Sequence, residues 1–317
     1  MIPRIDSHRH MGGSISSEFV WDVICELDLK HLAETEDEVR AKMQFLPGEK
    51  PGFKKFLDKF VILDHLPWTE ELIDQSIAAV CIGLADDRID YTWMRFSVNK
   101  YVERMNWTAK EAVKFIYEAF QRHRPDKVAL ILSLKYESAR TSQRQYAAII
   151  DDPDMSEILA GVDLVGDETF FDYEFYGEIL APWRKQERKI ICAHVAESQK
   201  AENAYQAIKT LGVTEIAHGI KCTQGMLALA KDRQIGFGLA LTSNYLTGVW
   251  SDVTYHPIRK LMGAGVDCMI GTDDPVQCST NLNQEFELAW KVGLTDEQCK
   301  LLRVTAVERS RRYGLLT

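Results

Sequence analysis

The chain contains 317 residues, of which 46% are hydrophobic and 27% are charged, a balance typical of a globular protein with a sizeable core. Acidic residues outnumber lysines and arginines by 47 to 38, so the net charge is −9. A surface of this sign repels nucleic-acid backbones and anionic membranes, and we therefore expect neither as a partner.

The seven cysteines show no CxxC spacing, which argues against a disulfide framework or a zinc ribbon and indicates a reducing compartment. The first residues lack the apolar segment of a signal peptide, and no run of about 18 apolar residues is present to span a membrane. We therefore expect a cytoplasmic protein. Because the composition does not shift along the chain and no linker interrupts it, we expect residues 1–317 to form one domain.

Short apolar runs recur along the chain and are typical of strands that are buried on both faces. In chain order, the predicted strands are Arg4–Ser7, Tyr91–Val98, Val128–Leu134, Leu159–Val165, Lys189–Val195, Glu215–His218, Ile235–Leu241 and Cys268–Thr272. Amphipathic segments with helical spacing lie between these runs. The predicted helices include Glu70–Leu84, Thr108–Gln121, Tyr173–Arg188, Lys200–Leu211 and Thr223–Asp232.

Two features mark where helices begin and end. Thr108 precedes Glu111 by three positions, which is the spacing of a capping box. The segment 282–313 is predicted to be helical throughout, with Gly314 placed as its stop. The long interval 14–89 between the first two strands exceeds one crossover helix, so we expect several extra helices there, which form a lid.

Strands that alternate with helices predict parallel βα units, and eight of them favour a closed (β/α)8 TIM barrel. The alternative is an open, doubly wound sheet, which often carries a glycine-rich phosphate turn after an early strand. Neither GxGxxG nor GxxxxGK[ST] follows any predicted strand. The sequence therefore favours an α/β barrel with an insertion after the first strand and a helical C-terminal tail.

Polar side chains gather at the downstream ends of the predicted strands, where the active site of a barrel lies. His8 and His10 stand two positions apart on the first strand, so both imidazoles point the same way. His194 ends the fifth strand and Asp273 follows the eighth. Three imidazoles and one carboxylate suit Zn²⁺ with an open position for water, and we predict one zinc ion held by these four residues.

Three further polar residues at the same strand ends complete a hydrolytic set. A metal ion lowers the pKa of a water molecule toward neutrality. His218 can accept a proton, Glu197 can supply one to the substrate, and Asp274 can hold the attacking hydroxide or the edge of the substrate. Taken alone, an Asp-Pro pair such as Asp274-Pro275 indicates a turn. The other histidines are expected to be ordinary core or surface residues, with His256 near the rim: His31, His65, His123 and His256.

These motifs, in this order, resemble the adenosine deaminase family of the amidohydrolase superfamily. The resemblance covers nearly the whole chain. The matching segments are 5–14 (IDSHRHMGGS), 161–168 (GVDLVGDE), 194–197 (HVAE), 217–220 (AHGI), 242–248 (TSNYLTG), 256–257 (HP) and 272–275 (TDDP). No PCxxC motif is present, which excludes the other class of zinc deaminases.

The resemblance implies a (β/α)8 barrel with one zinc ion, which removes the 6-amino group of a purine as ammonia. It assigns the zinc to the same four residues as the geometric argument. It implies that Glu197 donates a proton to purine N1 and that His218 is the base or electrostatic partner of the attacking hydroxide. It further implies that Asp274 orients that hydroxide and contacts N7, and that the backbone N–H of Gly166 faces N3.

The segment Pro51–Phe60 resembles the gate helix of the same family. Four of its apolar residues fall on one helical face: Phe53, Phe56, Leu57 and Phe60. The functional interpretation is a hydrophobic lid that excludes water from the purine. The alternative is an ordinary helix that packs its apolar face on the core.

One position departs from the family pattern. Adenosine-specific members usually carry an aspartate where this chain has Gly12, and that aspartate holds the ribose 5′-hydroxyl. Glycine cannot make this contact, so the substrate we expect is a small aminopurine nucleoside, either adenosine or a 5′-modified adenosine. A deaminase of adenine or of another amino-heterocycle is the first alternative, and a barrel that binds a nucleoside without turnover is a more remote one. The sequence does not indicate an oligomeric state.

Overall fold

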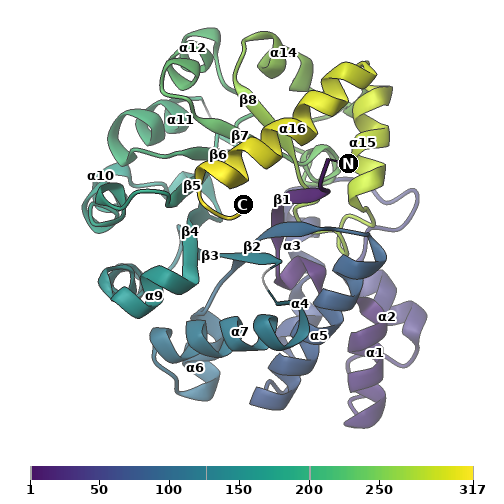
Figure 1. The fold of residues 1–317 in the computed structure, drawn as a ribbon. Helices are drawn as coiled ribbons and strands as arrows, with labels where there is room; N and C mark the ends of the chain where they lie inside the picture. The colour runs from purple at the N-terminus through teal and green to yellow at the C-terminus, as the bar shows by residue number, and fades with distance from the viewer. Residues whose placement is uncertain (1, 126, 200, 317) are drawn as a thin grey trace.

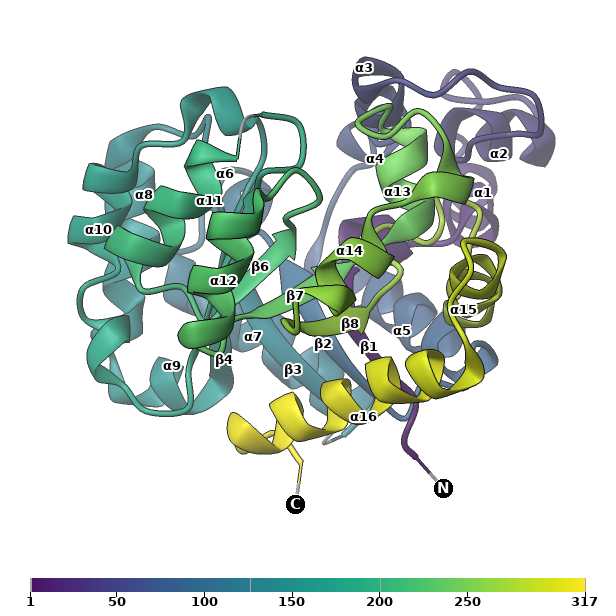
Figure 2. The same ribbon diagram turned by 90° about the horizontal axis from the view of Figure 1, so that it is seen from above.

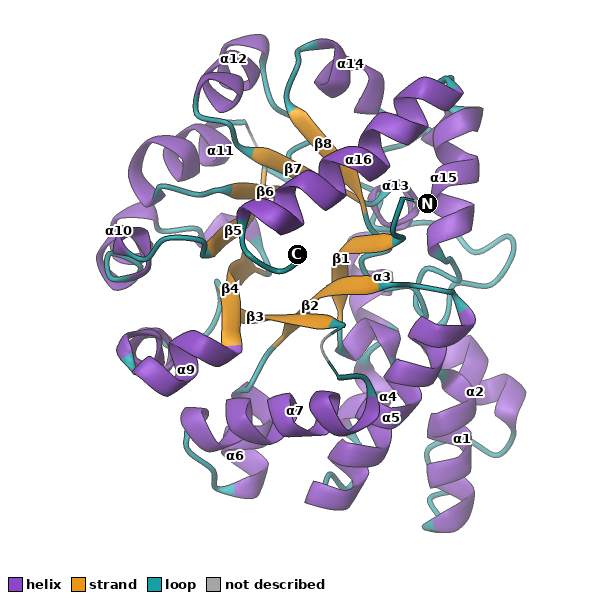
Figure 3. Ribbon diagram, in the orientation of Figure 1, coloured by secondary structure: helices purple, strands orange, loops and turns teal. Residues whose placement is uncertain are grey.

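The computed structural model of the protein describes residues 2–125, 127–199 and 201–316. Its centre is a parallel sheet of eight strands, in which neighbours in the chain are also neighbours in the sheet. Figure 3 shows the strands as a ring that the helices surround. The predicted barrel is therefore confirmed. The strands are β1 (Ile5–His10), β2 (Tyr91–Phe96), β3 (Val128–Lys135), β4 (Leu159–Val165), β5 (Ile190–Val195), β6 (Glu215–His218), β7 (Gly236–Leu239) and β8 (Asp267–Ile270).

The ring closes between β8 and β1 through a residue just beyond β8. Asp273 forms an isolated parallel bridge with Arg9 of β1. Its carbonyl accepts a hydrogen bond of 2.8 Å from the His10 N–H, and its own N–H donates to the His8 carbonyl at 2.6 Å. Because the sheet joins strands from both ends of the chain, we propose that residues 1–317 form a single domain.

The helices lie outside the strands and over both ends of the barrel. Several occupy the interval between β1 and β2, as predicted. The helices are α1 (Ser17–Glu26), α2 (Glu36–Met43), α3 (Phe53–Asp58), α4 (Val61–Asp64), α5 (Glu70–Asp86), α6 (Asn99–Met105), α7 (Ala109–His123), α8 (Arg140–Ala148), α9 (Pro153–Ile158), α10 (Tyr173–Ile179), α11 (Glu202–Gln206), α12 (Gln224–Asp232), α13 (Leu241–Leu246), α14 (Ile258–Gly263), α15 (Leu282–Lys291) and α16 (Asp296–Arg312). Within the described ranges, no helix combines the length and apolar character needed to cross a bilayer.

Side-chain caps explain most of the helix starts that the sequence predicts. Thr108 and Glu111 form the predicted capping box at α7, and Thr223 caps α12 by accepting the Met226 N–H. The prediction of one continuous helix over 282–313 is wrong. Gly293 adopts a left-handed φ of 92°, and Thr295 then opens α16 with its own capping box.

Two other predicted helices are shorter than expected. The helix predicted over 173–188 ends at Ile179, and a 3₁₀ turn over Trp183–Lys185 follows it. The helix predicted from Lys200 begins in the structure with α11 and continues as a π-helical turn, η5 (Ala207–Leu211). Lys200 itself lies outside the described residues.

The interior of the barrel is apolar at one end, where α16 covers it. Figures 1 and 2 show α16 across the end that holds both chain termini, while α3 and α4 lie over the opposite end. Trp93 lies in this apolar layer and donates its indole N–H to Ser310 of α16 at 3.0 Å. The layer consists of Ile5, Tyr91, Trp93, Ala129, Ile131, Ala160, Ile190, Cys192, Ala217, Met269, Ala306, Val307 and Tyr313.

A buried ion pair anchors α16 below this layer. Arg309 donates to Glu215 of β6 at 2.6 Å and to the carbonyls of Gln234 and Thr214 at 2.8 Å. Both charged side chains are 2% exposed. Removal of one partner from such a pair leaves an uncompensated charge in the interior.

We predict that Arg309→Met lowers the free energy of unfolding by about 3–5 kcal/mol, because Glu215 then lies buried without its cation. Urea denaturation of the purified variant measures this loss. The double variant Arg309→Met/Glu215→Gln is the matched control and should regain most of the stability. A single variant within about 1 kcal/mol of the unmodified protein would show that the pair does not anchor the helix.

Candidate metal centre

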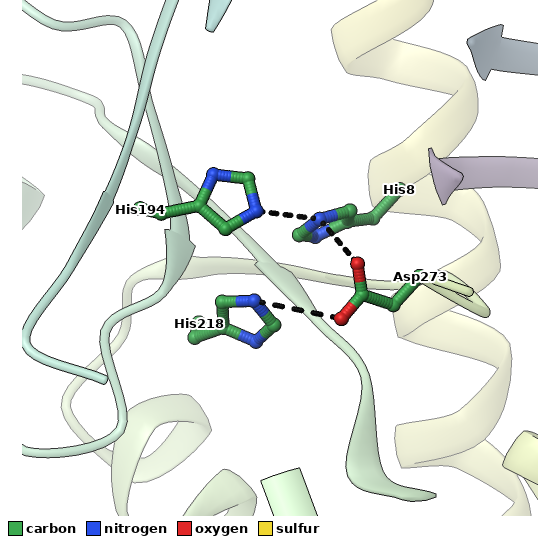
Figure 4. A group of neighbouring side chains, drawn as sticks. All are labelled: His8, His194, His218 and Asp273. Atoms are coloured by element: carbon green, nitrogen blue, oxygen red, sulfur yellow. Dashed lines mark hydrogen bonds and ion pairs between the residues drawn. The ribbon is translucent and has the colours of Figure 1, made fainter. Parts of the chain in front are cut away.

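Five polar side chains converge at the end of the barrel opposite α16. His8 and His10 project from the last residues of β1, two positions apart, and thus share a direction. His194 lies near the end of β5, His218 ends β6, and Asp273 follows β8. Figure 4 shows four of them pointing toward one another. The predicted convergence of distant residues is therefore present in the structure.

Three strand ends reach the site through left-handed backbone. Ala196, His218 and Asp273 have φ values of 53°, 62° and 61°. Such conformations cost a non-glycine residue about 1–3 kcal/mol and persist only where the surroundings hold them. Asp273 is held by its paired hydrogen bonds with β1. The barrel therefore maintains strained backbone at His218 and Asp273 of the cluster and at Ala196, next to Glu197.

The donor atoms of four residues are spaced as a small cation requires. His8 Nε2 lies 3.2 Å from His194 Nε2 and 3.3 Å from His10 Nε2. Asp273 Oδ1 lies 3.3 Å from His8 Nε2 and 3.2 Å from His10 Nε2. Ligands about 2.0–2.2 Å from a tetrahedral Zn²⁺ are about 3.3–3.6 Å apart. His8 Nε2 cannot share one hydrogen with His194 Nε2, His10 Nε2 and Asp273 Oδ1 at once. A cation can be bound by all four atoms.

Hydrogen bonds to groups behind the cluster orient the imidazole rings of His8 and His194. His8 Nδ1 lies 3.4 Å from the Gly238 carbonyl, and His194 Nδ1 lies 3.1 Å from Asp163 Oδ1. Since each Nδ1–H donates outward, each Nε2 keeps its lone pair for the cluster. Burial alone would raise the pKa of Asp163, but His194 and Arg95 hold it well below its ordinary value. Asp163 is therefore an anionic acceptor behind His194.

The histidines are electrically suited to metal binding. Burial, with a smaller contribution from Arg95, lowers the pKa of His8 to about 3. Burial likewise lowers the pKa of His218 well below its ordinary value. Both rings are therefore neutral near pH 7, which is the form that ligates metals. A buried site of three histidines and one aspartate is thus present.

Two choices of the third histidine are geometrically open. The ligand atoms of His8, His194, His218 and Asp273 all lie within 4.8 Å of one another. However, His218 Nε2 is 3.8 Å from Asp273 Oδ2, whereas His10 Nε2 is 3.2 Å from Oδ1. We propose that His10 completes the ligand set with His8, His194 and Asp273, as the sequence indicates, and that His218 lies beside it.

Two carboxyl groups next to this cluster have raised pKa values. Burial, opposed by His194 and reinforced by Asp273, raises the pKa of Glu197 to about 8. Burial and the neighbouring Asp273 also raise the pKa of Asp274 well above its ordinary value. Both groups can therefore hold a proton near neutral pH and donate it to a bound molecule. Gly13 permits the position of Asp274, since a Cβ at Gly13 would lie 1.9 Å from Oδ1.

A buried carboxylate that the sequence analysis did not assign holds the loop of Glu197. Glu168 accepts the backbone N–H groups of Ala196, Glu197 and Ser198 at 2.7–2.9 Å. Its side chain is 3% exposed. Glu168 therefore fixes the turn that follows β5. Asp163 and Glu168 both lie in the motif 161–168, and the charge of Asp163 within the apolar strand β4 is a signal that could have identified that residue.

A cavity of about 440 Å³ opens beside the cluster. His10 and Asp274 of the site line it, together with Gly13 and Gly166. Gly166 has a φ of 105° and lies against the Glu137 carboxylate, so a side chain there would be strained and crowded. Nothing lies within 4 Å of the point where a Cβ of Gly12 would stand. The lining residues are His10, Met11, Gly12, Gly13, Ile15, Phe56, Leu57, Phe60, Leu63, Asp64, Trp68, Arg95, Phe96, Ser97, Asn99, Lys100, Tyr101, Ser133, Lys135, Glu137, Val165, Gly166 and Asp274.

The segment that resembles a gate helix divides between α3 and the start of α4. Phe56, Leu57 and Phe60 line the cavity, whereas Phe53 does not and is 39% exposed. Leu57 is half exposed despite lining the cavity. The structure therefore brings three of the four expected apolar residues to the mouth and places Phe53 outside it.

Residues 3–312 match a protein family described as adenosine deaminase. An adenosine deaminase of Aliivibrio fischeri is 27% identical over 97% of this chain and 93% of its own length. An adenosine deaminase of Shewanella loihica is 26% identical, again over 97% of this chain and 93% of its own length.

Solved structures share the fold. An adenine deaminase from Arthrobacter aurescens superposes with a TM-score of 0.81 at 18% identity, covering 100% of this chain and 97% of its own. An N6-methyl-AMP deaminase from Arabidopsis thaliana gives 0.81 at 18% identity, with 99% and 95% covered. An amidohydrolase from Burkholderia ambifaria with bound Zn gives 0.79 at 19% identity, with 97% and 85% covered.

Substitution of the two competing histidines separates the alternative ligand sets. We predict that His10→Ala weakens metal binding at least about tenfold, because it removes a ligand, whereas His218→Ala retains about one metal ion per chain. Elemental analysis after dialysis against a weak chelator measures the content. His65→Ala, which alters a histidine outside the cluster, is the control. Loss of metal in His218→Ala together with retention in His10→Ala would reverse the assignment.

Proposed function

This chain belongs to the adenosine deaminase family of hydrolases, and on that basis we propose that it removes the 6-amino group of an aminopurine nucleoside by zinc-dependent hydrolysis. The observation that carries the proposal is the arrangement of polar groups beside the cavity, where His10 and Asp274 reach the wall. A buried cluster of three histidines and an aspartate lies beside two carboxyl groups with raised pKa values. Metal-assisted hydrolysis needs this combination of groups.

The donor set fits zinc, because mixed nitrogen and oxygen ligands at tetrahedral spacing suit this ion. We propose that His8, His10, His194 and Asp273 hold it. When bound, such a cation makes a water nucleophile available near neutral pH. The zinc bound in the related amidohydrolase of similar fold supports this choice of metal.

Glu197 is the proposed proton donor to ring nitrogen N1. A protonated N1 draws electrons from C6 and makes that carbon more open to attack. Burial raises the pKa of Glu197 to about 8, so the carboxyl carries the proton that this step requires. Glu168 holds the backbone N–H of Glu197 at 2.9 Å and thereby keeps the acid in place.

Asp274 and Gly166 are proposed to hold the edges of the purine. N7 is a hydrogen-bond acceptor, so a contact from Asp274 requires a protonated carboxyl, and its raised pKa supplies that form. Gly166 borders the cavity and permits close approach of its backbone to N3. Ser133 also lines the cavity, and its buried hydroxyl has no hydrogen-bond partner among the described residues, so a substrate atom can supply one.

The apolar part of the cavity wall favours an uncharged substituent on the sugar. It includes Ile15, Leu63, Trp68, Phe96 and Tyr101. A purine whose C6 faces the metal directs N9 away from it, toward these walls. The free space beside Gly12 leaves room for the sugar and its 5′ substituent. Phe56, Leu57 and Phe60 then cover the base from the mouth, as a lid does.

Several polar groups of the cavity wall are already engaged with other side chains. Ser97 donates to Asn99 at 2.9 Å, and Asn99 donates to Ser138 at 3.0 Å. Lys100 forms an ion pair with Asp64. A phosphate would have to break these contacts, whereas an apolar group would not. We therefore propose a nucleoside with a small or apolar 5′ group, and treat adenine and nucleoside monophosphates as the alternatives to be tested.

We predict that Glu197→Gln lowers kcat for ammonia release by about 10²–10⁴-fold, because the amide cannot protonate N1. The variant should still bind the substrate, since the shape of the side chain is kept. Ammonia release and ligand titration calorimetry measure the two properties. Glu187→Gln, an exposed substitution far from the cluster, is the control. Turnover near that of the unmodified enzyme would remove Glu197 from this role.

We predict that the enzyme prefers 5′-deoxy-5′-methylthioadenosine to AMP and adenine, because part of the cavity wall is apolar and the charges of Lys100 and Asp64 are paired. Gly12→Asp should shift the ratio of kcat/KM toward unmodified adenosine by about tenfold, roughly the worth of one hydrogen bond. Steady-state kinetics on the four compounds measures the ratios. A preference for AMP, or an unchanged ratio in the variant, contradicts this assignment of the sugar end.

A further inference from the structure

A relay of hydrogen-bonded side chains runs from His256 through Asn244 to His218, outside the proposed ligand set. Asn244 belongs to α13, and His256 precedes α14. The two residues are 0% and 3% exposed. Asn244 lies between His256 and His218, within hydrogen-bonding distance of both. The hydrogen bonds of a buried relay of this kind have a direction, because each of them needs one donor and one acceptor.

The His256 end of the relay sets the direction of its hydrogen bonds. The backbone N–H of Ile258 lies 3.2 Å from His256 Nδ1, and a backbone N–H can only donate. His256 Nδ1 is therefore an acceptor. Burial lowers the pKa of His256 to about 4, so the ring is neutral near pH 7 and its single hydrogen is on Nε2. That nitrogen lies 3.0 Å from Asn244 Oδ1 and donates to it.

The direction of these hydrogen bonds also fixes the orientation of the Asn244 side-chain amide toward the site. Because the oxygen of Asn244 accepts from His256, its NH₂ group faces the other way. That group lies 2.9 Å from His218 Nδ1 and 3.4 Å from Glu197 Oε1. It donates to both. His218 Nδ1 is then an acceptor, and the hydrogen of the neutral ring is on Nε2.

We propose that His256 and Asn244 are positioning residues that hold His218 with its hydrogen on Nε2, so that His218 meets the reacting atoms as a hydrogen-bond donor. His218 Nε2 lies 3.6 Å from Glu197 Oε1 and 3.8 Å from Asp273 Oδ2 and thus faces the reaction centre. This role rests on the proposed function. Of the two roles that the family resemblance implies for His218, a base or an electrostatic partner, the relay selects the second.

The relay also bears on the choice of metal ligands. A ligating Nε2 has no hydrogen, so His218 as a ligand would need its hydrogen on Nδ1. The Asn244 NH₂ group would then face a second donor at 2.9 Å, which is repulsive. His10 has no such conflict among the described contacts. The hydrogen-bond direction and the donor spacing therefore agree on the same four ligands.

The direct test is the tautomer of His218 in the zinc-loaded enzyme. Nitrogen-15 NMR of histidine-labelled protein distinguishes a ring nitrogen that bears hydrogen from one that does not, and the spectrum of His218→Gln identifies the signals. We predict hydrogen on Nε2 in the unmodified enzyme and on Nδ1 in Asn244→Asp, because a carboxylate can only accept. Asn281→Asp is the matched control, since either residue caps α15. Hydrogen on Nδ1 in the unmodified enzyme, or no change in Asn244→Asp, overturns the proposal.

Kinetics test the remote member of the relay. His256→Leu removes the donor to Asn244 and should lower kcat by about 10–100-fold, with KM within about threefold. In His256→Gln an amide N–H takes the place of the Nε2–H, and kcat should stay within about threefold of the unmodified enzyme. An equal decrease of kcat in both variants, or a change in KM alone, contradicts a positioning role. The NMR measurement needs no turnover, so it remains decisive if no aminopurine is deaminated.

Discussion

Two backbone hydrogen bonds join the fold of this protein to its chemistry. They run between β1 and the residue after β8, from the His10 N–H to the Asp273 carbonyl and from the Asp273 N–H to the His8 carbonyl. These bonds close the barrel, and the same three residues carry proposed metal ligands. Any change that opens this seam therefore moves the proposed ligands apart.

Asp6 reinforces the seam from within the barrel. Its carboxylate accepts from the Thr272 hydroxyl at 2.6 Å, the Thr272 N–H at 3.1 Å and the His8 N–H at 3.3 Å. Burial raises the pKa of Asp6, and Arg9 opposes that rise. The interior thus changes character along its axis, from the apolar layer that α16 covers to a polar layer in which side chains orient one another. This gradient places the imidazoles and carboxyl groups of the candidate site at the end of the barrel opposite α16.

The sequence predicts what depends on short-range spacing. The HxH pair of β1, the strand order and the capping box of Thr108 all follow from period and local chemistry, and the structure confirms each of them. The break at Gly293 was missed because the helical pattern continues across it. The location of Phe53 depends on how α3 lies against the barrel. Glu168, Asn244 and His256 gain their roles from contacts between distant loops, which no spacing along the chain reveals.

We propose that a zinc ion binds at the β1–β8 seam, held by His8, His10, His194 and Asp273. Anomalous diffraction at the zinc absorption edge, on crystals of the metal-loaded enzyme, locates the ion. We expect one strong peak about 2.0–2.2 Å from the Nε2 atoms of these three histidines and from Asp273 Oδ1. A peak bonded to His218 Nε2 in place of His10, or no peak at the seam, would contradict it.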